Sequence, residues 1–163
     1  MRYDKPKIQR LSNEAVFDLA RELFTKGKSL KFVVSGNSMY PFIRHERDIV
    51  TLAAATLDEV KVMDIVLAYR ANDGKYFLHR LVKKTADTFY MVGDAFTAFE
   101  GPIPASALIG VVTEVYRVNR RNGSEKLMSG PFYRLLIRLW RIVRPLRPAI
   151  IKLYFTIRRG RHG

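Results

Sequence analysis

Residues 64–84 read DIVLAYRANDGKYFLHRLVKK, and this stretch decides the fold class. Two runs rich in Val, Ile, Leu, Tyr and Phe flank the string Asn72-Asp73-Gly74. Asn, Asp and Gly adopt the positive φ angles that tight turns between antiparallel strands need. The stretch therefore predicts a β-hairpin with strands at residues 64–70 and 75–84.

Segments of similar composition recur along the chain and predict further strands at residues 29–34, 48–52, 88–92 and 108–119. Residues 13–26 differ, because their apolar side chains recur at helical spacing between a start signal at Ser12 or Asn13 and a stop signal at Gly27. We expect a mainly β protein with one N-terminal amphipathic helix.

The composition limits the chemistry that the chain can carry. Its 163 residues, 48% of them hydrophobic, suffice for one compact core. There is no cysteine, which excludes disulfides, a thiol nucleophile and Cys-ligated zinc. The only histidines are His45, His79 and His162, so we expect neither a histidine-rich metal site nor a cofactor.

One serine and one histidine stand out as a candidate catalytic pair. Ser38 follows Gly36 and Asn37 in a turn-like string, and His79 lies in the expected strand at residues 75–84. A serine on a tight turn with an imidazole nearby gains a general base without cysteine or metal. Taken singly, each residue is more often structural, since serine beside glycine commonly completes a turn.

The pair gains weight from the order of the short motifs around it. These are Ser38-Met39-x-Pro41, Asp48-Ile49-Val50, Asp64-Ile65-Val66-Leu67, His79-Arg80-Leu81-Val82 and Gly93-Asp94. Their order resembles the signal peptidase I superfamily of serine peptidases, which includes the LexA-type self-cleaving repressors. The resemblance covers about residues 32–116, and it implies a coiled, mostly antiparallel β-fold.

The resemblance also implies roles for individual residues. Ser38 matches the nucleophile, and His79 stands where many relatives carry a lysine base, which is similar to the branch of the endoplasmic-reticulum signal peptidase. Lys75, Lys83 and Lys84 do not align with that base.

Two acids are candidates to orient the imidazole as the third member of a triad. Asp94 occupies the family's Gly-Asp position, and Glu100 stands where relatives of the histidine branch carry another acid. The alternative for Asp94 is a turn residue paired with Arg80. For the oxyanion, the backbone N–H of Ser38 is the natural donor, and the Ser35 hydroxyl is a second candidate.

The sequence departs from the family at two turns. Relatives place glycine before the aspartates that correspond to Asp48 and Asp64, whereas this chain has Arg47 and Met63. We expect these larger residues to make turns that normally use the positive φ of glycine.

The excess positive charge lies almost entirely in the tail. Residues 1–116 hold sixteen Lys/Arg against fourteen Asp/Glu, whereas residues 117–163 hold thirteen against Glu125 alone. From Pro131 to Arg158, aromatic and aliphatic residues interleave with arginines at helical spacing, interrupted by Pro145 and Pro148. The pattern predicts a basic amphipathic helical tail.

The pattern is compatible with three placements of this tail. The arginines are too frequent for a transmembrane helix, so we expect residues 131–158 to lie on an anionic membrane surface, with Trp140 and the aliphatic side chains toward lipid and Arg134, Arg138, Arg141 and Arg144 toward headgroups. The alternative is a helix that packs on the β-domain and exposes its arginines. Nucleic acid is not expected, because basic helices that follow phosphates rarely need such apolar surface.

These observations predict an N-terminal helical segment at residues 1–28, a β catalytic domain at 29–119 and the tail at 120–163. The expected function is a serine endopeptidase acting on a peptide or protein, through a Ser-His dyad or a Ser-His-acid triad. The alternative is a catalytically silent or self-cleaving LexA-type regulatory module. No secretory signal peptide is visible, so the expected location is cytoplasmic, peripheral on the inner membrane face.

Overall fold

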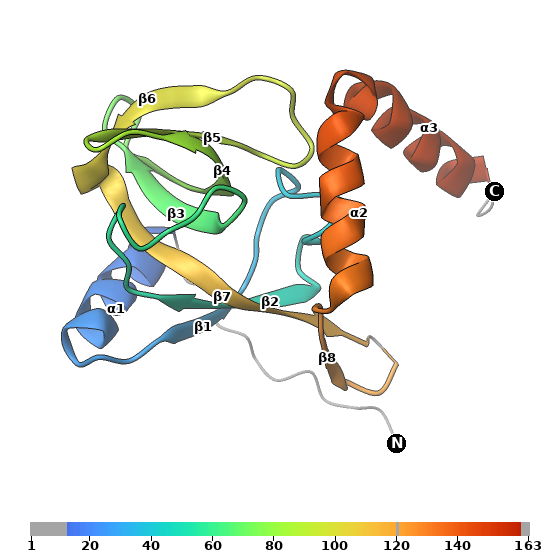
Figure 1. Ribbon diagram of the computed structural model, residues 1–163. Coiled ribbons are helices and arrows are strands. Elements are labelled where there is room, and N and C mark those ends of the chain that lie inside the picture. The colour runs from blue at the N-terminus through green and yellow to red at the C-terminus, as the bar shows by residue number, and fades with distance from the viewer. Residues whose placement is uncertain (1–12, 120, 161–163) are drawn as a thin grey trace.

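The chain folds around one antiparallel sheet that curls into a half-barrel (Figure 1). The structure is a computed structural model, and it describes residues 13–119 and 121–160. Strands follow one another across the sheet in the order β1-β2-β7-β3-β4-β5-β6, and β8 pairs with β7. The prediction of a mainly β, antiparallel protein is confirmed.

The strands, in chain order, are β1 (Leu30–Val33), β2 (Asp48–Ala53), β3 (Ile65–Arg70), β4 (Lys75–Lys84), β5 (Thr88–Val92), β6 (Glu100–Pro104), β7 (Leu108–Val118) and β8 (Glu125–Leu127). The helices are α1 (Asn13–Thr25), α2 (Pro131–Ile142) and α3 (Arg147–Gly160), with short 3-10 turns at Ala105–Ala107 and Arg144–Leu146. Sequence analysis missed β6 and β8. The two prolines of β6 disguise a strand that pairs only with β5, and β8 is short and exposed.

The hairpin predicted from residues 64–84 forms as expected. Ile65 pairs with Arg80 at one end of β3 and β4, and Arg70 pairs with Lys75 at the other. Gly74 takes a φ of +66°, which the tight connection requires. The inward side chains of both strands, with those of β5, form an apolar cluster around Phe89.

Helix α1 belongs to the same core as the sheet. Its residues Leu19, Ala20 and Leu23 pack against Leu30 of β1 and Leu52 of β2. The helix ends at Thr25, and the φ of +65° at Gly27 just beyond it lets the Lys28 amide donate to the Leu23 carbonyl. Helix α1 thus covers one side of the sheet (Figure 1).

The long loop from β1 to β2 carries Ser38 and is attached to the sheet by buried contacts. Met39 and Ile43 are buried in an apolar cluster with Val50 of β2. Asp48, fully buried, receives two hydrogen bonds from Arg117 of β7 and one from the Arg44 amide. These contacts fix the position of the loop that carries Ser38.

Two residues other than glycine take positive φ angles near the unusual turns. Met63 has a φ of 87°, so it does adopt the conformation expected of it. At the other turn Glu46, with a φ of 50°, takes this role in place of Arg47. Such conformations cost about 1 kcal/mol or more. At Met63 the carbonyl accepts a hydrogen bond from Arg80, which helps to hold the turn.

The C-terminal helices pack on the β-domain, beside the loop that joins β5 to β6 (Figure 1). Trp140 donates its indole N–H to the Asp94 carbonyl at 2.7 Å, and its ring contacts Phe42 edge-on. Arg144 donates to the Thr97 carbonyl. Trp140 and Arg144 therefore face the protein, and the expectation that they face lipid and headgroups is wrong.

The reason for this correction is that an indole N–H and a guanidinium bind backbone carbonyls as well as lipid headgroups.

Pro148 does not interrupt the helical pattern as expected. It lies within α3, near the start of the helix, where a missing N–H costs nothing. No helix in the described part of the chain is long and apolar enough to cross a membrane.

We predict that Asp48→Ala destabilises the protein by about 3 kcal/mol, because it leaves Arg117 without its buried counter-charge. Urea unfolding followed by circular dichroism measures the change. Asp73→Ala is the matched control, since its ion pair with Arg70 lies on the surface and should contribute about 1 kcal/mol or less. Equal losses in the two variants would contradict the structural role given to Asp48.

Candidate active site

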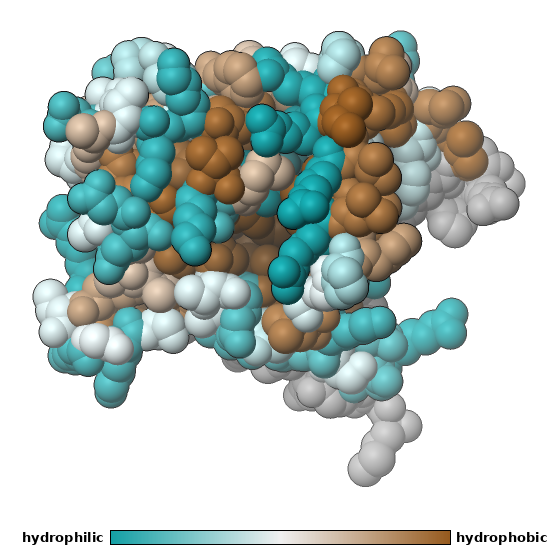
Figure 2. Space-filling model, viewed as in Figure 1, coloured by the Kyte–Doolittle hydropathy of each residue, from teal (hydrophilic) through white to brown (hydrophobic). Residues whose placement is uncertain are grey.

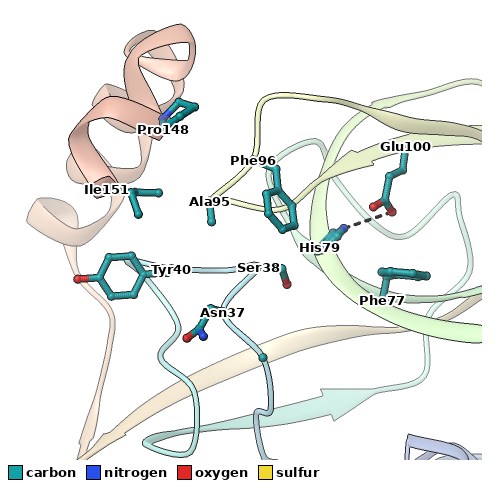
Figure 3. Close-up of a pocket in the computed structure, with 11 residues that line it drawn as sticks. Asn37, Ser38, Tyr40, Phe77, His79, Ala95, Phe96, Glu100, Pro148 and Ile151 are labelled. Carbon is teal, nitrogen blue, oxygen red and sulfur yellow. Dashed lines mark ion pairs between the residues drawn. The ribbon is translucent and has the colours of Figure 1, made fainter. Parts of the chain in front are cut away.

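A pocket of about 510 Å³ brings together parts of the chain that are far apart in sequence (Figure 3). Its lining comes from the β1–β2 loop, β4, the β5–β6 loop, the start of β6 and α3. The lining residues are Gly36, Asn37, Ser38, Tyr40, Phe77, His79, Ala95, Phe96, Glu100, Pro148 and Ile151. Three of the four predicted catalytic residues, Ser38, His79 and Glu100, are among them.

His79 and Glu100 face each other inside this pocket. The Nδ1 atom of His79 lies 3.3 Å from Oε2 of Glu100, and both atoms are buried. Among the described residues neither atom makes a well-aligned hydrogen bond, so each has the other as its nearest partner. A carboxylate at Nδ1 favours the tautomer with its proton there, which leaves Nε2 as the acceptor.

The other ring nitrogen of His79 points toward the serine turn. A Cβ built at Gly93 would lie 3.1 Å from His79 Nε2 and 2.6 Å from the Ser38 carbonyl oxygen. The same carbonyl accepts a hydrogen bond from the Ala95 amide at 2.8 Å. Gly93 is therefore the point where the imidazole edge and the Ser38 backbone approach each other.

Ser38 is half-buried, and its side chain borders the same space as the imidazole (Figure 3). No hydrogen bond joins its Oγ to His79 in the part of the chain that the structure describes. Catalytic hydrogen bonds are often long in unliganded sites and shorten when substrate binds.

Burial lowers the pKa of His79 below its ordinary value of about 6.5, because the rings of Phe77 and Phe96 flank the imidazole and exclude water. The negative charge of Glu100 opposes this shift but does not cancel it. His79 is therefore neutral at neutral pH, as a general base must be. The folded state correspondingly loses stability as the pH falls below about 6.5, where unfolding lets the imidazole bind a proton.

Asp94 takes a different place from Glu100. Its carboxylate accepts two hydrogen bonds from Arg80, at 2.9 and 2.6 Å, and the pair is buried. The pairing with Arg80 is the alternative to an orienting acid that the sequence offers for Asp94. Of the two acids, Glu100 is the one that contacts His79, whereas Asp94 anchors the β5–β6 loop to β4.

The two candidate oxyanion donors, the Ser35 hydroxyl and the Ser38 amide, also differ in their surroundings. Ser35 is exposed and is not among the residues that line the pocket. The amide N–H of Ser38 donates no hydrogen bond within the described residues and remains a candidate donor. Lys75, Lys83 and Lys84 are directed elsewhere, toward Asp73, the Tyr90 ring and the Leu57 carbonyl respectively.

Sequence analysis missed the residues that complete the pocket, above all Pro148 and Ile151 of α3. The signal was present in the apolar periodicity of the tail, which was interpreted as a lipid-facing surface. Within the described residues no three His, Asp or Glu side chains gather as ligands for a metal ion.

Comparisons of the chain with protein families, with curated proteins and with solved structures find no match.

We predict that Gly93→Ala lowers any hydrolytic activity of the site by about a hundredfold, because the added methyl group would force Ser38 and His79 apart. Gly74→Ala is the control for general destabilisation, since a Cβ there meets nothing within 4 Å and its positive φ strains only the remote hairpin turn. The measurement is kcat/KM, with circular dichroism to verify folding. Wild-type activity in a folded Gly93→Ala protein would show that the close approach is unimportant.

Proposed function

We propose that the protein is a serine endopeptidase, with the coiled β-fold of the signal peptidase and LexA superfamily. One observation carries the proposal: Glu100, His79 and Ser38 line a single pocket, and His79 presents Nδ1 to the carboxylate and Nε2 toward the serine turn. This is the order of contacts that a serine nucleophile, its base and an orienting acid require.

In the proposed first step Ser38 Oγ attacks the carbonyl carbon of a peptide bond while His79 Nε2 takes the hydroxyl proton. The Ser38 amide N–H stabilises the resulting oxyanion. The tetrahedral intermediate then expels the amine, which receives the proton from Nε2, and an ester to Ser38 remains. Glu100 stabilises the transient imidazolium and keeps its ring in place.

In the second step a water molecule attacks this ester, and His79 again accepts a proton and returns it to Ser38 Oγ. The products are a carboxylic acid and the free serine. No metal or cofactor is needed for this sequence of steps.

The test is to incubate the protein with a peptide library, to identify cleaved bonds by mass spectrometry, and in parallel to label it with a fluorophosphonate. Ser38→Ala should abolish cleavage and labelling, and His79→Ala should lower cleavage by at least about a thousandfold, because proton transfer would be lost. Ser106→Ala is the control, since this exposed serine lies outside the pocket. Absence of both cleavage and labelling in the wild type would favour the alternative, a catalytically silent interaction module.

The pH profile tests the assigned base. Because burial lowers the pKa of His79, kcat/KM should rise with pH along a limb centred below about pH 6.5. Glu100→Gln removes the charge that opposes this shift, so the limb should move to still lower pH while kcat falls about a hundredfold or more. A limb near the pKa of lysine would instead implicate a lysine base.

We also propose that the outer face of the C-terminal helices docks on an anionic membrane surface. Large apolar side chains stay exposed there although α2 and α3 pack on the domain. They are Phe132, Leu135, Leu136, Leu139, Ile142, Leu146, Ile150, Leu153 and Ile157. Figure 2 shows apolar side chains along α2 beside a column of hydrophilic ones. Arg134, Arg138 and Arg141 are exposed, and no acidic residue follows Glu125 in the sequence.

Docking should combine apolar burial with headgroup attraction of about 1 kcal/mol per arginine. We predict that Ile142→Asp, which changes a side chain that is 74% exposed, weakens binding to anionic vesicles at least tenfold. Leu127→Asp on β8 is the control, because it lies outside the helices. Co-sedimentation with vesicles measures binding, and high salt should weaken it without abolishing it. Equal binding by both variants would exclude this face as the docking surface.

A further inference from the structure

We infer that α3 selects the substrate: together with Tyr40 and Ala95 it forms an apolar subsite beside Ser38, in which Ile151 limits the size of the substrate side chain. This inference rests on the proposed peptidase function and names the class of peptide that the site takes, one with an aliphatic residue next to the bond that is cleaved.

The pocket has two chemically different halves on either side of Ser38 (Figure 3). One half holds His79, Glu100 and Phe77. The other half extends toward α3 and is lined by Tyr40, Ala95, Pro148 and Ile151. A peptide bond placed at Ser38 would therefore have the acid and base on one side and α3 on the other.

The half beside α3 favours an apolar side chain. Of the side chains that line it, only Tyr40 and, at its border with Ser38, Asn37 carry a polar atom, so a charged substrate residue there would lose water without gaining an opposite charge. Arg144 and Arg147 lie behind the loop that carries Ala95, and both bind backbone carbonyls rather than carboxylates. The positive charges of these two arginines disfavour a basic substrate residue most.

The wall formed by α3 is held in a fixed position. Arg147, only 3% exposed, donates to the Phe96 carbonyl at 3.0 Å and to the Trp140 carbonyl at 3.1 and 3.2 Å. Tyr154 of α3 packs its ring against that of Tyr40, with centroids 5.6 Å apart. The helix is thus joined to both loops that border the serine, and the space before Ile151 has a defined size.

Binding is best measured in the Ser38→Ala protein, which cannot turn over its ligand. The probes are fluorescein-labelled peptides of one Gly-Ser sequence that carry Leu, Ala, Lys or Glu at a single central position. We expect the Leu peptide to bind at least about tenfold more tightly than the Lys peptide, by fluorescence polarisation.

Ile151→Trp, which fills the subsite, should reduce this preference about tenfold or more, whereas Ile150→Trp should leave it unchanged because Ile150 does not line the pocket. Ile151→Ala removes volume instead, so it should shift preference from Leu toward a peptide that carries Trp. This second variant gives a gain of binding, which misfolding cannot imitate.

Equal affinity for all the peptides, no detectable binding, or the same effect of the Ile150 and Ile151 variants would overturn the subsite. A different result would overturn the peptidase proposal alone: selective, Ile151-dependent binding of the Leu peptide to the Ser38→Ala protein, together with no cleavage of that peptide by the wild type.

Discussion

The buried ion pair between Arg80 and Asp94 holds the candidate site together. Arg80 follows His79 on β4, and Asp94 follows Gly93 just after β5. This one ion pair therefore fixes both the imidazole and the glycine that lies against it. Arg80 also donates to the Met63 carbonyl. Breaking a pair of this kind leaves a charge without water or partner and costs about 3–5 kcal/mol. Burying two charges gains little stability in itself. The pair matters because it positions His79 and Gly93.

The loop that begins at this ion pair is bound from two directions. Toward the β1–β2 connection, the Ala95 amide donates to the Ser38 carbonyl. Toward the C-terminal helices, three carbonyls of the loop accept hydrogen bonds: Asp94 from Trp140, Phe96 from Arg147 and Thr97 from Arg144. Side chains of the tail, which the sequence predicted to face lipid, therefore satisfy backbone carbonyls of this loop. The tail and the candidate catalytic groups form one structural unit.

The limits of sequence reasoning are visible at particular residues. Alternation and turn chemistry predicted β4 and its hairpin because these signals are local. Local signals could not decide whether Asp94 or Glu100 contacts His79. Glu100 reaches His79 because the irregular pairing of β5 with β6 sets Met91 opposite Glu100. The prolines of β6 leave that strand without a sequence signature. The tail shows a similar limit. Its periodicity revealed two faces, but only the packing shows that Trp140 turns inward while Ile142 stays exposed.

The two halves of the pocket come from distant parts of the chain: the candidate catalytic groups lie between Ser38 and Glu100, and the facing wall lies at Pro148 and Ile151. Substitutions on α3 can reshape this wall while the contact between His79 and Glu100 stays intact. Under the proposed peptidase function, chemistry and selectivity can then evolve under separate selection, since a new substrate demands changes in only a few residues of one helix. For directed evolution, α3 is accordingly the segment to randomise, with the half-barrel left as it is.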